Sequence, residues 1–150
     1  MQRQTKKTSA EQVAQQLSRI LAAGDDSVHE GYVLTESWEK AGVGAESIEP
    51  ILRFMEEHPE VDYGMPGPLT HFVERFRDGS YERQLSQSIL RKPTPHTVGM
   101  LSRLIKGVRL RGAEKVRYLR LMESVKRHPH ADPLAIELAE EHLQWHASPD

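Results

Sequence analysis

Residues 51–69, ILRFMEEHPEVDYGMPGPL, place an apolar helical stretch before a His-Pro step and a second proline before another apolar stretch. Residues 118–134, YLRLMESVKRHPHADPL, repeat this order, and residues 89–95, ILRKPTP, carry a shorter version. Proline ends one helix and is favoured in the first turn of the next. We therefore predict three helix–proline–helix units, which bury a core by stacking on one another and present an extended binding surface.

Apolar residues recur at helical spacing along most of the remaining chain, and no stretch shows the alternation of a strand. The predicted fold is all-α, with seven to eight helices in antiparallel hairpins, arranged either as a HEAT-like stack or as an irregular bundle. Residues 1–8 are predicted as a flexible N-terminal tail and residues 9–147 as a single all-helical domain. The predicted helices begin near residues 10, 36, 45, 68, 81, 95, 113 and 133.

Some expectations concern individual segments. Residues 25–34 read as a loop or short turn, followed by a short helix over residues 36–40 that Thr35 can cap. Thr94 and Pro95 form an N-cap and first-turn pair, and Asp132 caps the last helix. The predicted apolar sides of the last two helices are Val116, Leu119, Met122 and Val125, then Leu134, Leu138, His142 and Trp145.

The charge of the chain is unevenly distributed. The formal net charge is -2, yet residues 25–62 hold 11 acidic and 2 basic side chains, whereas residues 63–131 hold 14 basic and 5 acidic ones. Such polarity can steer association with a charged partner. The alternative is that solvated helix faces simply differ in sign.

Composition excludes several kinds of chemistry. The 150-residue chain has no cysteine, so it has neither disulfides nor thiolate ligands and nucleophiles. Its first residues lack the apolar stretch of a signal peptide, and no apolar run is long enough for a bilayer. We therefore expect a cytoplasmic protein.

Histidines and paired acids give little support for an enzyme. His142 and His146 lie four apart on one predicted helix, which is compatible with metal binding, and residues 128–132 offer further ligands. The adjacent pairs of glutamates diverge on their helices, and no glycine-rich phosphate loop is present. We expect no catalytic residues, no metal and no cofactor, and keep a small enzyme or metal protein as a third hypothesis.

Basic side chains favour one alternative function. Residues 91–127 contain eleven Lys and Arg residues, which could contact phosphates in a nucleic-acid-binding or regulatory adaptor. Tyr118 is the only aromatic residue in that stretch, and the helix after Pro95 is mostly apolar, unlike a recognition helix. Nucleic acid is therefore the less favoured partner.

Two loop motifs carry a resemblance to a known family. Residues 62–69, DYGMPGPL, with His71 and Glu74, and residues 91–97, RKPTPHT, resemble small all-helical immunity proteins of bacterial polymorphic and contact-dependent toxin systems. The likeness spans about residues 38–106. It implies a non-enzymatic bacterial protein that binds a cognate toxin domain and blocks it.

The resemblance also implies where a partner would bind. An inhibitor of a nuclease toxin would use an acidic surface, which residues 25–62 can supply, with aromatic anchors at its centre. Trp38 and Tyr63 are the candidate anchors, and burial in the core is the alternative interpretation for both. The predicted partner-binding residues are Trp38, Glu39, Glu56, Glu57, Glu60, Asp62, Tyr63, His71, Glu74 and His96.

Overall fold

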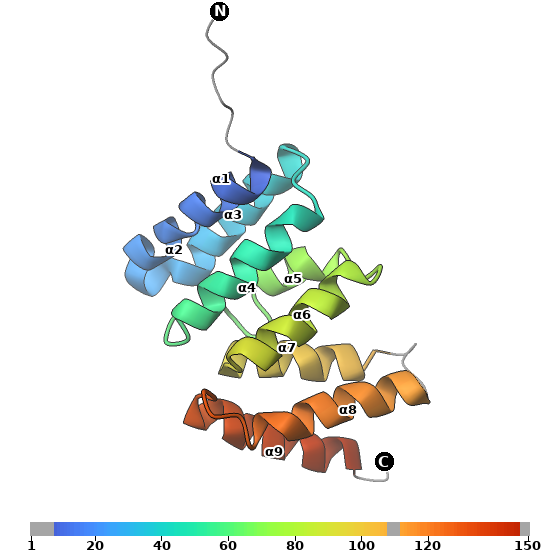
Figure 1. Ribbon diagram of the computed structural model, residues 1–150. Helices are drawn as coiled ribbons and strands as arrows, with labels where there is room; N and C mark the ends of the chain where they lie inside the picture. The colour runs from blue at the N-terminus through green and yellow to red at the C-terminus, as the bar shows by residue number, and fades with distance from the viewer. Residues whose placement is uncertain (1–7, 108–111, 148–150) are drawn as a thin grey trace, which may run out of the picture. The chain divides into compact units, whose positions relative to one another are not determined.

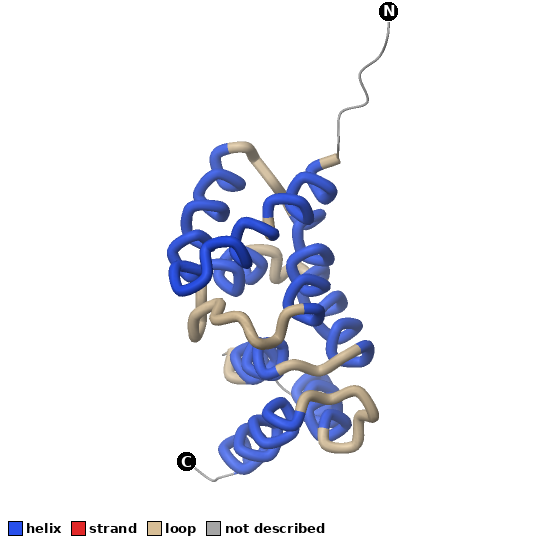
Figure 2. The backbone as a smooth tube through the Cα atoms, turned by 90° about the vertical axis from the view of Figure 1, so that its left-hand side faces the viewer, coloured by secondary structure: helices blue, strands red, loops and turns tan. Residues whose placement is uncertain are grey.

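The structure is a computed structural model that describes residues 8–107 and 112–147. Every regular element in these residues is a helix (Figures 1 and 2), which confirms the all-α class. The most extensive contacts join α2 with α3 and α8 with α9, which are neighbours in the sequence, and α7 with α9, which are separated by α8. The α-helices are α1 (Ser9–Gln16), α2 (Ser18–Ala23), α3 (Ser27–Lys40), α4 (Ile48–Glu57), α5 (Pro68–Glu74), α6 (Ser80–Arg91), α7 (Pro95–Ile105), α8 (Ala113–Val125) and α9 (Pro133–Ala147), with 3₁₀ turns η1 (Gly24–Asp26) and η2 (Ala45–Ser47).

The chain forms two compact units. Unit 1 comprises Met1–Phe54 and Glu60–Tyr81, and unit 2 comprises Met55–Pro59 and Glu82–Asp150. The boundaries fall inside α4 and α6, so each of these helices contributes to both units. The single all-helical domain over residues 9–147 stays a prediction, and all but one residue of the predicted tail 1–8 lie outside the described residues.

In unit 1, the hairpin of α2 and α3 packs with α5 around a continuous apolar core. Gly31 lies in the middle of α3, where a Cβ atom would stand 2.7 Å from Pro68 Cγ at the start of α5. Glycine costs helix stability, but here it allows α5 to approach. Fully buried members of this core include Val13, Leu17, Ile20, Leu34, Leu69 and Phe72.

In unit 2, α7 packs with both α8 and α9. The Thr94 side chain accepts a hydrogen bond from the Thr97 backbone N–H, and the Thr97 side chain accepts one from the Thr94 N–H, which makes a capping box for α7. Pro95 occupies the first turn. Both parts of the predicted Thr94–Pro95 start are therefore confirmed.

The proline junctions predicted from the sequence are confirmed. The helices α5, α7 and α9 begin at Pro68, Pro95 and Pro133. Asp132 Oδ1 accepts a hydrogen bond from the Leu134 N–H at 2.9 Å, which confirms its capping role. Among the described residues, none of the helices has the length and apolar character needed to span a membrane.

Two local predictions are wrong. Residues 27–34 are helical rather than a loop, because α3 begins at Ser27, and Thr35 lies within this helix with its hydroxyl bonded to the Tyr32 carbonyl. The first helix, expected to begin near residue 10, begins at Ser9 and is capped by Thr8, whose side chain accepts a hydrogen bond from the Glu11 N–H.

The apolar sides of the last two helices also differ from the expected ones. In α8, Tyr118, Met122 and Val125 are buried, but Val116 is 46% exposed. In α9, the buried residues are Ala135 and Ala139, whereas Leu134 and Trp145 are 50% and 59% exposed. Ala135 and Ala139 lie four residues apart, so the side of α9 that carries them faces the core, rather than the side that carries Leu134 and Trp145.

Candidate functional site

A pocket in unit 1 lies where the connector between α4 and α5 meets the turn between α2 and α3. Its volume is about 310 Å³. The connector contributes Glu60, Val61 and Asp62, and the remaining lining residues are Ile20, Leu21, Gly24, Asp25 and Ser27. The pocket therefore combines an apolar lining with three carboxylates.

Hydrogen bonds hold the connector against the turn. The Ser27 hydroxyl donates to the Asp62 carbonyl at 2.7 Å, and Ser27 itself is buried. The Asp62 side chain accepts the Gly64 N–H at 2.9 Å. Gly64 has a positive φ of 93°, a conformation that favours glycine. These contacts set the position of the Asp62 backbone and carboxylate at the pocket.

Tyr63 anchors the connector from inside unit 1. Its side chain is 3% exposed, and its ring packs edge-to-face on Phe54 with centroids 6.1 Å apart. Burial raises the pKa of the Tyr63 phenol, and the negative charge of Glu60 raises it further. Tyr63 therefore lies in the core, as the alternative interpretation expected, and its neighbours Glu60 and Asp62 remain exposed.

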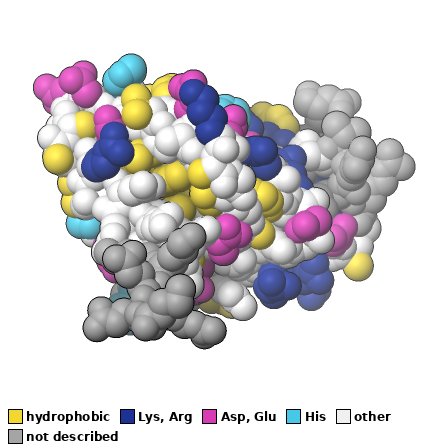
Figure 3. Space-filling model, turned by 90° about the horizontal axis from the view of Figure 1, so that it is seen from above, with side chains coloured by type: hydrophobic (Ala, Val, Ile, Leu, Met, Phe, Trp, Pro, Cys, Tyr) yellow, Lys and Arg dark blue, Asp and Glu magenta, His cyan; other side chains and the backbone are white. Residues whose placement is uncertain are grey.

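The charged residues that line the pocket are all acidic. Asp25, Glu60 and Asp62 are all exposed, and neither residues 20–39 nor residues 54–74 contain a Lys or Arg. The nearest basic residue along α2, Arg19, forms an ion pair with Glu30 at 2.7 Å. The face drawn in Figure 3 shows Lys and Arg side chains interspersed among those of Asp and Glu.

Trp38 and Glu39, both predicted to bind a partner, have different environments. Trp38 is 2% exposed, and its indole N–H donates to Gln16 Oε1 at 2.6 Å while its ring packs edge-to-face on Phe72. Core burial, the alternative for this residue, therefore describes its environment. Glu39 lies at the surface and forms an ion pair with Arg75 at 3.3 Å.

His71 and Glu74 lie on α5 within one helical turn. Their side chains are 3.6 Å apart, and Glu74 also accepts a hydrogen bond from Arg77 at 3.1 Å. The Glu74 side chain is 11% exposed and that of His71 is 56% exposed. This arrangement stabilises the end of α5 and the turn after it.

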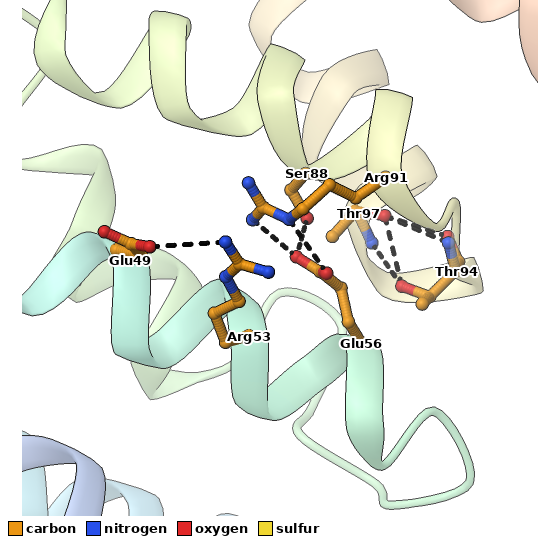
Figure 4. Close-up of polar contacts among 7 residues, drawn as sticks. All are labelled: Glu49, Arg53, Glu56, Ser88, Arg91, Thr94 and Thr97. Carbon is orange, nitrogen blue, oxygen red and sulfur yellow. Dashed lines mark hydrogen bonds and ion pairs between the residues drawn. The ribbon is translucent and has the colours of Figure 1, made fainter.

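The other three predicted residues, Glu56, Glu57 and His96, belong to unit 2. Glu56 is buried and accepts hydrogen bonds from the Ser88 hydroxyl at 2.7 Å and from Arg91 at 2.8 and 3.1 Å (Figure 4). Glu57 is exposed. The His96 ring and the Pro59 carbonyl are 2.9 Å apart. Glu56 and His96 therefore hold residues 55–59 to α6 and α7.

Sequence reasoning thus found two of the residues that line the pocket, Glu60 and Asp62, and missed the others. Asp25 and Ser27 were missed because residues 25–34 read as a loop with no defined neighbour. The signal that could have indicated them is the pair Asp25–Asp26 after Gly24, a helix stop that carries two charges. Partner binding by the ten predicted residues stays a prediction.

The basic stretch of residues 91–127 is partly engaged within unit 2. Arg91 is paired with Glu56, and Lys126 forms an ion pair with Glu123 at 2.9 Å. Lys106 lies over the Trp145 ring at 4.4 Å. Arg109 and Arg111 lie outside the described residues.

The histidines considered as metal ligands have other contacts. Within residues 8–107 and 112–147, no three His, Cys, Asp or Glu side chains gather in a way that could hold a metal ion. The His128 ring and the Leu90 carbonyl are 2.6 Å apart. Burial and the nearby Lys106 lower the pKa of both His142 and His146.

Comparisons with protein-family models, curated proteins and solved structures found no match for this chain.

Proposed function

We propose that the chain is a protein-binding inhibitor, an immunity protein that neutralises a cognate bacterial toxin domain, with a nuclease as the toxin class that its charge suits. The observation that carries this proposal is the pocket of unit 1, where Asp25, Glu60 and Asp62 surround an apolar lining. The resemblance of residues 62–69 and 91–97 to immunity proteins supports it, since the first of these motifs begins at the pocket itself.

The pocket suits a Lys or Arg side chain of a partner protein. Such side chains have an apolar stem and a charged head. Leu21 and Val61 can contact the stem while the carboxylates attract the head. A nuclease presents basic side chains because it must grip phosphates, so an acidic inhibitor surface would be complementary to its substrate-binding face.

The alternative proposal, nucleic-acid binding through residues 91–127, has less support. A cation that contacts phosphate must exchange its counterions for the nucleic acid. Arg91 and Lys126 already have protein carboxylates as partners, and Arg91 is largely buried with Glu56. These two residues would have to give up their ion pairs in order to bind a phosphate.

The test is a binding measurement with the toxin domain encoded beside this gene. We expect a tight complex by isothermal titration calorimetry that weakens as salt rises. Glu60→Lys and Asp62→Lys should each raise the Kd about 10-fold or more, since each places a like charge against a basic partner. Glu140→Lys, an exposed change on α9, is the matched control and should leave the Kd within about 3-fold of the original.

Two results would contradict the proposal. One is equal affinity of the Glu60→Lys, Asp62→Lys and Glu140→Lys variants for the toxin domain, which would place the contact away from the pocket. The other is the absence of any complex with that domain together with salt-sensitive retention on duplex DNA or RNA, which would favour the nucleic-acid alternative.

A further inference from the structure

The connector between α4 and α5 contains a tight loop, residues 63–67, at the surface of unit 1. The two ends of this loop lie against each other: a Cβ atom on Gly67 would stand 1.5 Å from the Tyr63 carbonyl oxygen, and one on Gly64 would stand 2.7 Å from the Gly67 Cα. Because the ends meet, Met65 occupies the tip. Its side chain is 79% exposed, more than any other large apolar side chain that the structure describes.

Contacts on the inner side of the loop hold its backbone in place. Tyr63 is buried in unit 1, and the Asp62 carbonyl just before it accepts the hydrogen bond of the Ser27 hydroxyl. A Cβ atom on Gly64 would lie 3.6 Å from Val28 Cγ1, so the loop also lies against the first turn of α3. A side chain on a backbone that is already fixed leaves less conformational entropy to be lost on binding.

The position of Met65 distinguishes it from other exposed apolar residues. Single apolar residues at a protein surface are common and need no explanation. Met65, however, lies at the tip of a fixed loop and three residues after Asp62, which lines the acidic pocket. Methionine is enriched in the centres of protein interfaces, and its flexible thioether side chain adapts to irregular recesses. Met65 thus offers apolar area that the fold itself leaves uncovered.

The charges beside the loop indicate which kind of surface would cover Met65. Glu60 and Asp62 are exposed just before the loop, and residues 54–74 contain no Lys or Arg. These carboxylates would repel an anionic lipid surface or a nucleic acid, whereas they would attract a basic protein surface. The occupant that fits both features is a protein surface with an apolar recess between basic side chains.

We propose that Met65 is the apolar anchor of the partner interface and inserts into a recess on a basic protein, whose Lys or Arg side chains meet Glu60 and Asp62. This inference rests on the proposed function and adds the apolar centre to its acidic pocket. An apolar anchor beside a charged rim is the usual arrangement of a binding hot spot.

The test is isothermal titration calorimetry of the full chain with the toxin domain encoded beside this gene. Met65→Ser should raise the Kd about 10-fold or more, since it removes apolar area that binding buries. Met65→Leu keeps an apolar side chain of similar volume and should retain most of the affinity. Leu134→Ser is the matched control, because Leu134 is 50% exposed on α9 of unit 2, and its Kd should stay within about 3-fold of the original.

Salt separates the apolar anchor from the charged rim. The fold-change caused by Glu60→Lys should shrink as salt rises, because salt screens exposed charges. The fold-change caused by Met65→Ser should not shrink, because burial of apolar area does not depend on that screening.

Oxidation provides a second measurement on the original sequence. Met55, Met100 and Met122 are buried, so Met65 is the exposed methionine among those in residues 8–107 and 112–147. Hydrogen peroxide transfers one oxygen atom to the thioether and leaves water, which turns the apolar side chain into a polar sulfoxide. Peroxide should therefore raise the Kd of the original chain about 10-fold, and methionine sulfoxide reductase should reverse this. The Kd of Met65→Leu should not respond to peroxide.

The outcomes distinguish failure of this inference from failure of the proposed function. A complex that Glu60→Lys weakens, but that neither Met65→Ser nor peroxide affects, would overturn the inference alone. The absence of any complex with the toxin domain would overturn the proposed function and this inference with it. Urea denaturation completes the test: Met65→Ser should keep the original midpoint because the side chain is exposed, and a lowered midpoint would assign Met65 to the fold and overturn the inference.

Discussion

The end of α4 and the connector just after it carry the same kind of charge but have opposite environments. Glu56 is buried and held by Ser88 and Arg91, whereas Glu60 and Asp62 are exposed at a pocket. Only three residues separate Glu56 from Glu60 in the sequence. One carboxylate is therefore enclosed by the fold, and the other two lie at the surface.

The difference between these carboxylates arises far away in the sequence. Arg91 lies 35 residues after Glu56, and its guanidinium reaches that carboxylate because α6 packs beside the last turn of α4 within unit 2. The connector instead packs on the α2–α3 turn through Ser27, which offers a hydroxyl and no cation. Local charge density thus indicates an acidic region, while packing decides which acids stay at the surface.

The largest effect should follow from a change that displaces the connector. A Cβ atom on Gly67 would lie 1.5 Å from the Tyr63 carbonyl oxygen, so Gly67→Ala must move backbone atoms on one side or the other. We expect a loss of about 4 kcal/mol in the free energy of unfolding, measured by urea denaturation. Toxin-domain binding by the pocket should also weaken, since Glu60 and Asp62 would shift.

A second glycine provides the control for that change. Gly99 lies inside α7, and a Cβ atom there would meet nothing within 4 Å. Gly99→Ala should raise the free energy of unfolding by up to about 1 kcal/mol through helix propensity. Equal stabilities of the Gly67→Ala and Gly99→Ala variants would show that the connector has room for a Cβ atom beside the Tyr63 carbonyl oxygen.

The next largest loss of stability should distinguish the buried carboxylate of Glu56 from the exposed ones. Glu56→Gln keeps the shape of the side chain but leaves the guanidinium of Arg91 without its counter-charge, and the Arg91 side chain is only 28% exposed. We expect a loss of about 2.5 kcal/mol in the free energy of unfolding. Binding of the toxin domain should change little, because Glu56 is buried in unit 2.

Neutral variants of the exposed acids complete this test. Glu57→Gln and Glu60→Gln should each change the free energy of unfolding by less than about 0.5 kcal/mol, measured in the same urea series. Only Glu60→Gln should weaken binding of the toxin domain. The comparison fails if Glu56→Gln is as mild as Glu57→Gln, since Glu56 would then not depend on its ion pair.

Features of this structure that depend on nearby residues could be predicted from the sequence, whereas features that depend on distant contacts could not. Proline and capping residues act within a few positions, so the starts of α5, α7 and α9 were predicted correctly. The helix α3 was missed because Gly31 lowers local helix propensity, and its compensation, the approach of Pro68, comes from 37 residues away.

The residues of the candidate site likewise divide into those that local sequence indicates and those that only distant contacts place there. Glu60 and Asp62 were predicted from charge and from a loop motif, but Asp25 and Ser27 reach the pocket only through the packing of the α2–α3 turn on the connector. Trp38 and Tyr63 were predicted as aromatic anchors, and their burial depends on Gln16, Phe72 and Phe54 in other helices. Sequence spacing within one helix gives no information about such contacts.

The two tryptophans extend this comparison from carboxylates to aromatic side chains. The difference in stability between their variants should be smaller than the differences above. Trp38→Phe removes the hydrogen bond to Gln16 Oε1 and part of the contact with Phe72, so we expect a loss of about 1.5 kcal/mol. Trp145 is 59% exposed, so Trp145→Phe should change stability by less than about 0.5 kcal/mol.

Fluorescence provides an independent measurement of the same contrast, since the chain has two tryptophans. The Trp145→Phe variant retains the buried indole of Trp38 and should emit at shorter wavelength than the Trp38→Phe variant, which retains the exposed one. The opposite order of emission maxima would contradict the assigned environments.

The smallest effect should appear as a pH dependence that originates in unit 2 rather than at the acidic pocket. Burial first, and then the positive charge of Lys106, lower the pKa of His142 and His146 below the usual 6.5; Lys115 adds to this at His146, and Glu141 opposes it at His142. As pH falls below about 6.5, the unfolded chain therefore binds these protons before the folded chain does.

The free energy of unfolding should consequently be highest above pH 6.5 and decrease as pH falls through the window below it. The decrease is small because both imidazoles are partly exposed and solvent screens their charges. Urea midpoints at about pH 7.5 and about pH 5.5 should differ less in the double variant His142→Gln/His146→Gln than in the original chain. If the two differences are equal, the acid sensitivity belongs to the carboxylates, and the histidines of α9 have no part in it.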